Sequence, residues 1–249
     1  PQYAAATTAT VCDEVYRTLM KMRWQPSLKI VPHYESDPLY IEALVNSLNK
    51  KIKEINWKPD LILASYHGIP QKYFDKGDPY HCYCHKTTRL ISEKFTSIEI
   101  KTTFQSRFGP EKWLQPYTDK TLENLPKEGK KNVLAICPGF SSDCVETLEE
   151  IQIQGKESFL ESGGENFDMV PCLNDNEDHI ILLKSLIQKN ILTICPGFSS
   201  DCVETLEEIL IEGKENFLSS GGENFDMVPC LNDNNDHINL LKSLIQQNI

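Results

Sequence analysis

The sequence predicts an α/β fold of layered parallel sheets with flanking helices. Short apolar strands alternate with amphipathic helices along the 249 residues, which indicates parallel βαβ units. The run 61–64 is apolar at every position, as in a central strand that is covered on both faces. Polar residues follow this run directly, and the carboxyl ends of parallel strands are where such sheets bind their ligands.

Hydrophobic spacing predicts the elements that precede this strand. Apolar residues recur at helical intervals over 5–23 and again over 38–55, and both stretches are therefore expected to be helices. Between them, residues 28–33 are rich in Leu, Ile and Val and predict a short strand.

The later elements follow from apolar runs, from alternation, and from the Pro and Gly residues that end them. In order, these signals predict a strand at 60–66, a loop at 71–80, a helix that ends near Phe95, a strand at 98–104, a helix at 119–125, a strand at 132–137 and a helix that begins near Ser142. Pro138 and Gly139 separate the last strand from its helix.

Composition and charge argue against several classes of function. The formal net charge of −11 argues against nucleic acid and anionic membrane surfaces, both of which attract basic proteins. No apolar run approaches the roughly 20 residues of a membrane span, and the sequence does not open with a basic and then apolar leader. The nine cysteines are an odd number, which favours reduced thiols in a cytoplasmic protein. Because the sequence opens on Pro1 rather than Met, we expect a processed, trimmed or incomplete product.

The chain repeats itself near its end. Residues 134–191, the first copy, and 192–249, the second copy, align without a gap at a period of 58 and differ at eight positions. This similarity exceeds that of an ancient structural repeat and predicts a recent tandem duplication or an assembly error. Each copy reads as strand, helix, strand and helix, which is half of an α/β domain and too little for a complete core.

The strongest candidate for chemistry lies where the strand at 60–66 ends. Ser65, Tyr66 and His67 occur there, and a Gly and a Pro then stop the regular structure. Histidine titrates near neutral pH, so His67 is able to accept a proton, donate one or ligate a metal. The alternative is a histidine that only hydrogen-bonds to a neighbouring loop.

A second candidate lies at the start of the helix in the repeated unit. Glu146 and Glu150 are four residues apart and share one helical face, where a row of carboxylates is able to ligate or guide a cation. The same positions in the second copy are Glu204 and Glu208. The alternative is structural, because Asp143 and Glu146 match a capping box at a helix N-terminus, where carboxylates are favourable.

A third strand end, residues 105–118, is rich in aromatic residues. Trp113 and Tyr117 are suited to wall a flat apolar ligand, or they pack in the ordinary way. Arg107 is suited to meet an acidic group of a substrate.

The segment His81-Cys-Tyr-Cys-His85 carries metal-ligating residue types at an unsuitable spacing. Structural zinc sites usually pair cysteines with two to four residues between them. Here Cys82 and Cys84 are two positions apart on a predicted helix, where they diverge. We therefore expect a helix surface that faces partly inward.

Four motifs taken together resemble the ferrochelatase family, whose members insert Fe²⁺ into protoporphyrin IX in the last step of haem synthesis. The motifs are Ser65-Tyr-His-Gly-Ile-Pro70, Gly77-Asp-Pro-Tyr80, Ser106-Arg-Phe-Gly-Pro110 with Trp113-Leu-Gln-Pro-Tyr-Thr118, and Pro138-Gly-Phe-Ser-Ser-Asp-Cys-Val-Glu-Thr-Leu-Glu-Glu150. They occur in the order of that family. The resemblance is to the bacterial type and covers nearly all of residues 1–190.

The resemblance implies two Rossmann-like, chelatase-like domains with a porphyrin cleft between them. On that basis residues 1–58 are the remnant of a first domain whose opening segment is missing, 59–191 form the second domain, and 192–249 repeat part of it. We expect the first copy to occupy the native position, because it follows the natural connection.

The resemblance also implies roles for individual residues. His67 matches the invariant histidine that accepts pyrrole protons or ligates iron, Glu146 matches the acidic residue opposite it, and Glu150 matches the next position of an acidic path. Tyr66 and Trp113 match pocket positions. The substrate-binding candidates are Ser65, Tyr66, Arg107, Trp113 and Tyr117, and the duplicate candidates for the carboxylates are Glu204 and Glu208.

The resemblance makes iron a substrate and not a cofactor, and without a C-terminal cysteine trio we expect no [2Fe–2S] cluster. The expected partners are protoporphyrin IX and ferrous iron, and the protein is expected to be a cytoplasmic monomer or homodimer. Two alternatives stay open. One is a related chelatase that acts on coproporphyrin or another tetrapyrrole. The other, favoured by the missing segment and the repeat, is a truncated chain that at most binds porphyrin.

Overall fold

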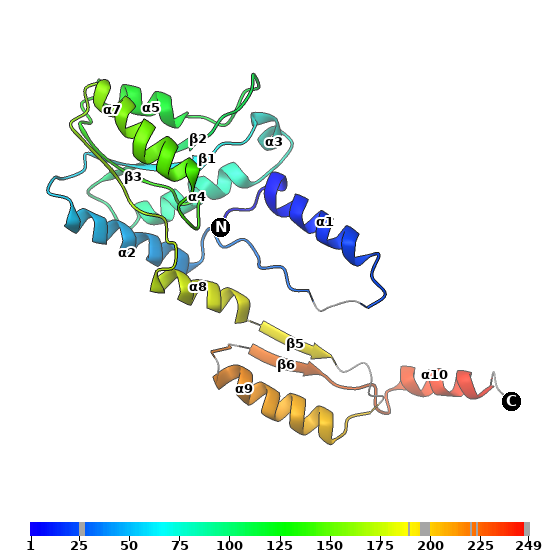
Figure 1. The fold of residues 1–249 in the computed structure, drawn as a ribbon. Helices are drawn as coiled ribbons and strands as arrows, with labels where there is room; N and C mark the ends of the chain where they lie inside the picture. Colours follow the sequence, from blue (N-terminus) through cyan, green and yellow to red (C-terminus); the bar gives the residue numbers. More distant parts are fainter. Residues whose placement is uncertain (25–27, 189, 195–199, 220, 223, 247–249) are drawn as a thin grey trace. The chain divides into compact units, whose positions relative to one another are not determined.

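The structure, a computed structural model, describes residues 1–249 except 25–27, 189, 195–199, 220, 223 and 247–249 (Figure 1). Contacts between residues divide the chain into two compact units, Pro1–Leu182 and Leu183–Ile249. The division into 1–58, 59–191 and 192–249 stays a prediction.

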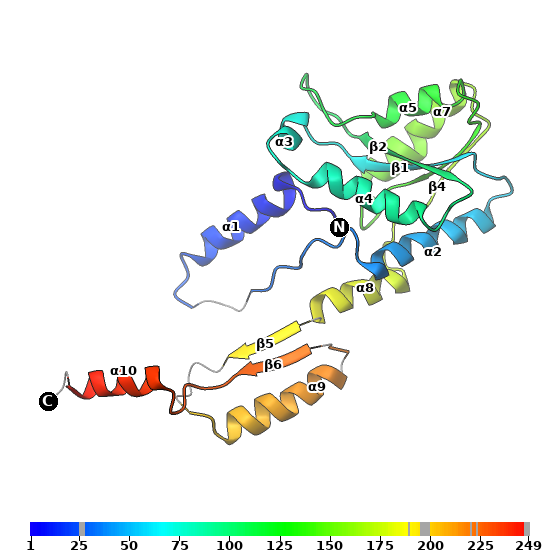
Figure 2. The same ribbon diagram turned by 180° about the vertical axis from the view of Figure 1, so that it is seen from behind.

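A four-stranded parallel sheet forms the centre of the first unit and confirms the predicted α/β class (Figures 1 and 2). Its strands are β1 (Leu61–His67), β2 (Glu99–Gln105), β3 (Asn132–Ile136) and β4 (Asn166–Met169), in the order β2-β1-β3-β4. The apolar sequences of β1 and β3 fit their central places, where neighbouring strands and helices surround them. In this register His67 lies opposite Gln105, so the carboxyl ends of β1 and β2 meet at one edge.

Helices cover both faces of this sheet (Figures 1 and 2). On one face lie α2 (Pro38–Glu54) and α4 (Tyr80–Ser92), and on the other lie α5 (Thr118–Asn124), the π-helix η2 (Leu148–Gly155) and α7 (Lys156–Glu161). The short helices α3 (Gln71–Asp75) and α6 (Val145–Thr147) follow β1 and β3, and α8 (Glu177–Gln188) follows β4.

Alternation along β1 decides which side chains face each layer. Leu63 belongs to the apolar cluster that includes Phe159 of α7, whereas Tyr66 hydrogen-bonds to α4 on the opposite side of the sheet. Ser65 and His67 continue the row of Leu63. They therefore emerge on the face that η2 covers.

Most predicted elements form within a few residues of their expected bounds, and two predictions are wrong. The predicted strand at 28–33 is absent, because residues 28–34 form no regular structure and pair with no strand; an isolated strand leaves its backbone groups unsatisfied. The predicted loop at 71–80 contains α3, which starts directly after Pro70. The predicted helix at 5–23 forms as a π-helical turn, η1 (Ala5–Ala9), that continues into α1 (Thr10–Leu19).

The second unit repeats the local structure of the first copy without its surroundings. Its elements are β5 (Asn190–Ile194), η3 (Glu204–Gly213), α9 (Lys214–Ser219), β6 (Asn224–Val228) and α10 (Asn235–Gln246), and β5 and β6 form a two-stranded parallel sheet. Leu182 is 0% exposed, but its counterpart Leu240 is 52% exposed; Val170 is 1% exposed and its counterpart Val228 is 40% exposed. The second copy therefore keeps its helices and strands while most of its apolar face stays in water.

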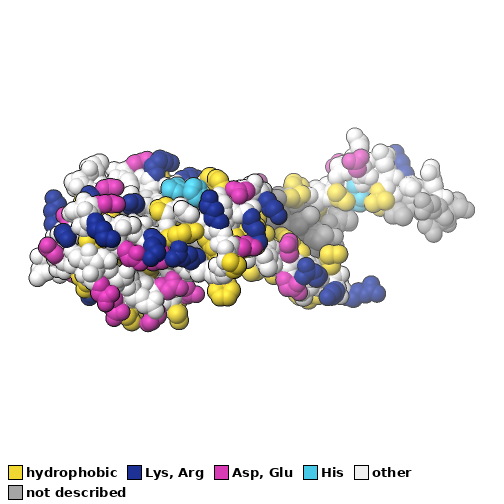
Figure 3. Space-filling view, turned by 90° about the horizontal axis from the view of Figure 1, so that it is seen from above, with side chains coloured by type: hydrophobic (Ala, Val, Ile, Leu, Met, Phe, Trp, Pro, Cys, Tyr) yellow, Lys and Arg dark blue, Asp and Glu magenta, His cyan; other side chains and the backbone are white. Residues whose placement is uncertain are grey.

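Charged side chains of both signs cover the face of the molecule seen in Figure 3. Lys and Arg side chains lie among Asp and Glu, with hydrophobic side chains between them. The described side chains on this face thus do not form the continuous basic stripe that a nucleic acid requires.

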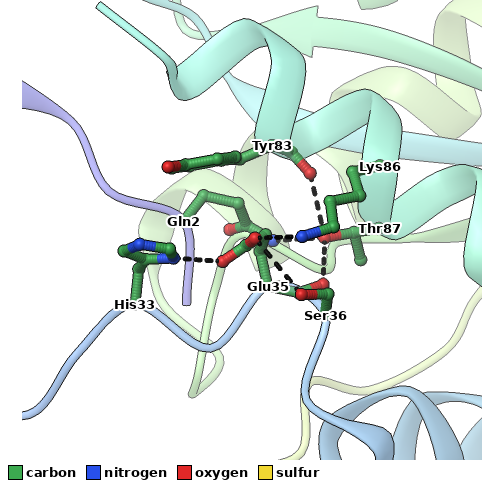
Figure 4. A network of polar contacts seen from close by, with 7 residues as sticks. All are labelled: Gln2, His33, Glu35, Ser36, Tyr83, Lys86 and Thr87. Carbon is green, nitrogen blue, oxygen red and sulfur yellow. Dashed lines mark hydrogen bonds and ion pairs between the residues drawn. The ribbon is translucent and has the colours of Figure 1, made fainter.

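A buried carboxylate ties the irregular segment before α2 to α4 (Figure 4). Glu35 is 1% exposed and accepts hydrogen bonds from Lys86 Nζ (2.9 Å) and His33 Nδ1 (2.6 Å). Its backbone oxygen accepts a third, from Thr87 Oγ1 (2.8 Å), and Gln2 donates to the same hydroxyl. Burial alone would raise the pKa of Glu35, but the bonds from His33 and Lys86 outweigh it and hold that pKa below its ordinary value.

We expect Glu35→Gln to lower the free energy of unfolding at pH 7 by about 1–3 kcal/mol, because charge-assisted hydrogen bonds are lost. A carboxyl with a lowered pKa stabilises the fold above its unfolded pKa of about 4.3, and this contribution disappears as the pH falls through the folded value. Urea unfolding of both proteins between pH 7 and pH 3 should therefore show the difference shrinking in acid. Glu93→Gln, a change at an exposed residue directly after α4, is the control. A difference that does not vary with pH contradicts this assignment.

Candidate active site

His67 ends β1 and has a fixed ring orientation. Its Nδ1–H donates to the backbone oxygen of Gly68 (2.7 Å), since a carbonyl can only accept. This leaves Nε2 as the atom able to take a proton or ligate a metal in the neutral ring. The Tyr80 hydroxyl donates to the backbone oxygen of His67 (2.9 Å), so α4 anchors the strand end. The histidine thus makes the loop contact named as its structural alternative, and its second nitrogen still has a lone pair to offer.

Gly68 allows this strand end to approach β2 closely. Its backbone N–H donates to the backbone oxygen of Gln105 (2.7 Å). A Cβ at this position would lie 2.8 Å from that same oxygen and 3.1 Å from the ring of Trp113. Any other residue at position 68 would therefore push the end of β1 away from the end of β2 and from Trp113.

Glu146 lies in α6, on the turn that follows β3. The predicted capping box with Asp143 is wrong: the box forms one residue later, between Cys144 and Thr147. Asp143 instead accepts hydrogen bonds from Asn174 Nδ2 (2.7 Å) and the Cys172 backbone N–H (3.1 Å) and so fixes the turn. The carboxylate of Glu146 is therefore not needed for that box.

The carboxylate of Glu146 is electrostatically linked to His67. The pKa of Glu146 is lowered first by a hydrogen bond from its own backbone N–H, then by one from the Cys144 thiol, and also by the charge of His67. His67 and Glu146, the reacting pair named from the sequence, follow different strands. The charge of His67 nevertheless affects the pKa of Glu146.

Gln105, which sequence reasoning did not select, joins these strand ends. It is buried at the end of β2, and its Oε1 accepts from the Ser65 hydroxyl (2.7 Å). Its Nε2 donates to the backbone oxygen of Glu146 (2.5 Å) and lies 3.4 Å from Glu150 Oε2. A polar residue directly after the alternating strand at 98–104, in register with His67, was the available signal.

Glu150 faces an open cavity beside η2. Its Oε2 accepts from the Ser106 hydroxyl (2.6 Å). The cavity has a volume of about 410 Å³ and its lining includes Glu150, Arg107 and Asp119. Arg107 donates to Asp119 (2.6 Å) and lies 4.4 Å from the ring centre of Tyr117, so its charge is already paired in this structure.

The structure brings the aromatic candidates to different places. Trp113 lies beside Gly68, and its indole N–H donates to the backbone oxygen of Phe108 (2.8 Å). Tyr66 is fully buried under α4, where its hydroxyl lies 3.0 Å from that of Thr88. Strand alternation points Tyr66 away from the side of His67, and the structure does not bring the two side chains together. Ser65 is likewise buried, and it positions Gln105.

The duplicate candidates Glu204 and Glu208 lie in η3 of the second unit. The pKa of Glu204 is lowered by hydrogen bonds from Cys202 and from its own backbone, as for Glu146, but no contribution from a histidine accompanies them. Within the described residues of this unit, β5 has β6 as its only strand neighbour, so no counterpart of β1 is present.

Two further observations concern metals and membranes. Across the part of the chain that the structure describes, no group of three or more His, Cys, Asp or Glu side chains could hold a metal ion. None of the described helices has the length and apolar character needed to cross a bilayer.

Comparison with known proteins gives a consistent match. The sequence model of the ferrochelatase family matches residues 1–191 and, separately, residues 187–249. The chain is 55% identical over 193 residues to a ferrochelatase of Rhizobium meliloti (strain 1021), which covers 77% of this chain and 57% of that protein. Over the same share of this chain it is 54% identical to a ferrochelatase of Allorhizobium ampelinum and 50% identical to one of Brucella anthropi, covering 56% and 55% of those proteins. The chain thus spans a little over half the length of these curated relatives.

Proposed function

The chain belongs to the ferrochelatase family, and from that premise we propose that the protein inserts Fe²⁺ into protoporphyrin IX to form protohaem. The observation that carries the proposal is the hydrogen-bond network of Gln105, which holds the strand end of His67 against the turn of Glu146. A base and a carboxylate held in one fixed frame suit a reaction that removes protons from a flat ring.

Metallation exchanges two pyrrole protons of the macrocycle for one divalent cation, so a proton acceptor and an anionic group are both required. In this proposal Nε2 of His67 accepts a pyrrole proton, because Nδ1 already donates to Gly68. The lowered pKa of Glu146 keeps its carboxylate ionised at neutral pH, where it stabilises the imidazolium that forms and attracts the cation. Iron is a substrate of this reaction and not a resident cofactor.

Glu150 supplies the next carboxylate on the path away from this pair. Gln105 contacts both Glu146 and Glu150, and Glu150 opens on the cavity of about 410 Å³. We therefore propose that cations arrive, or protons leave, through this cavity. Trp113, which lies beside Gly68 directly after His67, is the proposed wall for the porphyrin.

A second candidate function is porphyrin binding without metal insertion. It is supported by the aromatic ring of Trp113 beside Gly68, because an aromatic side chain is able to pack on a flat macrocycle whether or not metal is inserted. A cytoplasmic location is also proposed, and its support is that the eight cysteines described in the structure are all free thiols.

Anaerobic incubation with ferrous iron and protoporphyrin IX tests the proposed activity. We expect porphyrin fluorescence to fall as protohaem forms, and we expect His67→Ala to slow this by about a hundredfold or more, as for loss of a general base. His237→Ala, which removes a histidine of the second unit, is the control and should react at the normal rate.

A fluorescence titration with protoporphyrin IX alone separates the two candidate functions. Tight binding without any turnover supports the binding function and contradicts the enzymatic one for this chain. Turnover that survives His67→Ala contradicts the role given to the histidine.

A further inference from the structure

Two imidazoles lie one turn apart on α4, outside the proposed active site. The ring centres of His81 and His85 are 4.4 Å apart, with their planes inclined by 50°. Residues spaced i and i+4 share one helical face, so this proximity follows directly from the sequence. α4 covers the opposite face of the sheet from η2, which places the pair away from Glu146 and Glu150 (Figures 1 and 2).

The spacing of the two rings fits chelation of a single ion. Zinc binds imidazole nitrogen at about 2.0–2.1 Å, which puts the ion roughly 3.2 Å from the ring centre. Two such rings around one ion have centres about 4.5 Å apart at the right angle of a tetragonal site, and about 5.2 Å apart at the tetrahedral angle that zinc prefers. The observed 4.4 Å is the separation of the right-angled arrangement, which tetragonal copper adopts.

Both rings are available as ligands at neutral pH. Burial lowers the pKa of His81, and burial together with the neighbouring charge of His81 lowers the pKa of His85. Neutral imidazole is the metal-binding form. Among the described residues, no hydrogen bond or ion pair occupies a nitrogen of either ring. The nearby cation Lys86 is directed to Glu35, and Arg89 is directed to Glu93.

Aromatic packing holds the rings in place before any ion arrives. His81 stacks on Phe104 of β2 with ring centres 5.7 Å apart, and it also contacts Phe74 of α3 at 4.9 Å. His85 lies 6.2 Å from the same Phe104 ring. Ligands that are already ordered lose less conformational entropy on binding, which favours metal affinity.

The cysteines of this segment do not join the pair. Cys84 is buried and Cys82 is exposed, which confirms that the two diverge and that the segment faces partly inward. Burial also raises the pKa of the Cys84 thiol, so it stays protonated and is not a ligand. Two imidazoles alone remain on the shared face.

We propose that His81 and His85 chelate a divalent transition-metal ion of the zinc, cobalt or copper class, with water at its other coordination positions. Imidazole suits these ions, whereas Mg²⁺ and Ca²⁺ prefer oxygen ligands. A two-residue site holds its ion in exchange with solvent, since most of the coordination sphere belongs to water. This inference is independent of the proposed iron insertion.

Titration of the full chain with Co²⁺, followed by its visible absorption, measures this binding. Imidazole and water ligands give weak bands, whereas cobalt bound to thiolates adds intense near-ultraviolet charge transfer, so binding to the cysteines is recognised separately. We expect His81→Ala and His85→Ala each to weaken the thiolate-free site by about tenfold or more.

The double variant Cys82→His/His85→Ala is the matched control. It keeps the number of histidines but places them at adjacent positions, which point in different directions on a helix. We expect it to bind as weakly as His85→Ala. Zn²⁺ binding should shift the imidazole nitrogen NMR signals of His81 and His85 together. Wild-type affinity in either alanine variant, or in the double variant, overturns the proposal.

Discussion

Glu146→Gln should lower the rate of ferrous-iron insertion by about a hundredfold or more, whereas Glu204→Gln should leave it unchanged. Both glutamates follow the same Asp-Cys-Val sequence, and both have a pKa lowered by a neighbouring thiol and by their own backbone. Only Glu146 is also influenced by His67 and held by Gln105. The pair of variants therefore compares two local sequences that are alike in two different surroundings.

The assay is anaerobic porphyrin metallation at fixed protein concentration, with porphyrin binding measured in parallel. Unchanged binding together with slower metallation places the effect of Glu146 on the chemical step and not on the fold. If instead Glu204→Gln abolishes turnover, the second copy supplies the reacting carboxylate, and the assignment of the first copy to the active site is wrong.

Phe159→Ala should lower the free energy of unfolding of the first unit by about 3–5 kcal/mol, while Phe217→Ala should cost far less. Phe159 is 0% exposed and packs in the apolar cluster around β1 and β3. Phe217 is its counterpart in the second copy. It keeps its neighbour Phe225, at 5.8 Å between ring centres, but it is only partly buried.

Urea unfolding followed by circular dichroism measures both effects. The two compact units need not unfold together, so each transition is fitted separately. Hydrogen exchange of the β3 and β6 amides then assigns each transition to a unit. Equal losses for the two variants would mean that the second copy has a core as complete as the first, against the exposure of Leu240 and Val228.

Elements with strong periodic signals were predictable from sequence, and elements that depend on a partner were not. β1 was recognised because every residue of its core is apolar, and α2 because its apolar residues recur at helical spacing. The stretch 28–33 has the composition of a strand, but in the described part of the first unit it pairs with no strand, and the Glu35 network fixes the residues that follow.

The site was predictable at the level of strand ends and less so at the level of side chains. His67, Glu146 and Glu150 were named because their residue types fit the chemistry. Gln105 was missed because its importance arises from register: it lies opposite His67 and also reaches the helix after β3. A single sequence does not reveal that one residue contacts the ends of two other elements at once.

Tyr66 shows the converse case. Its place beside His67 in the sequence suggested a shared site, yet neighbouring residues of a strand point to opposite faces. The helical spacing applied to Glu146 and Glu150 is also altered in the structure, because the helix widens into a π-helix at Leu148. A π-helix shifts the facing of later residues, and no hydrophobic pattern in this segment announces it.

The burial difference between the copies has a consequence for how the sequence can evolve. Among the differing positions that the structure describes, Ala135 alone is buried in the first copy, and its counterpart is Thr193. A hydroxyl at position 135 would enter an apolar core without an assured partner, a change that selection for folding opposes. In the second copy the described residues Leu240 and Val228 are exposed where their counterparts are buried, so selection against polar substitutions is weaker there. Its substitutions are therefore free to accumulate at apolar positions, which makes it the segment expected to diverge first.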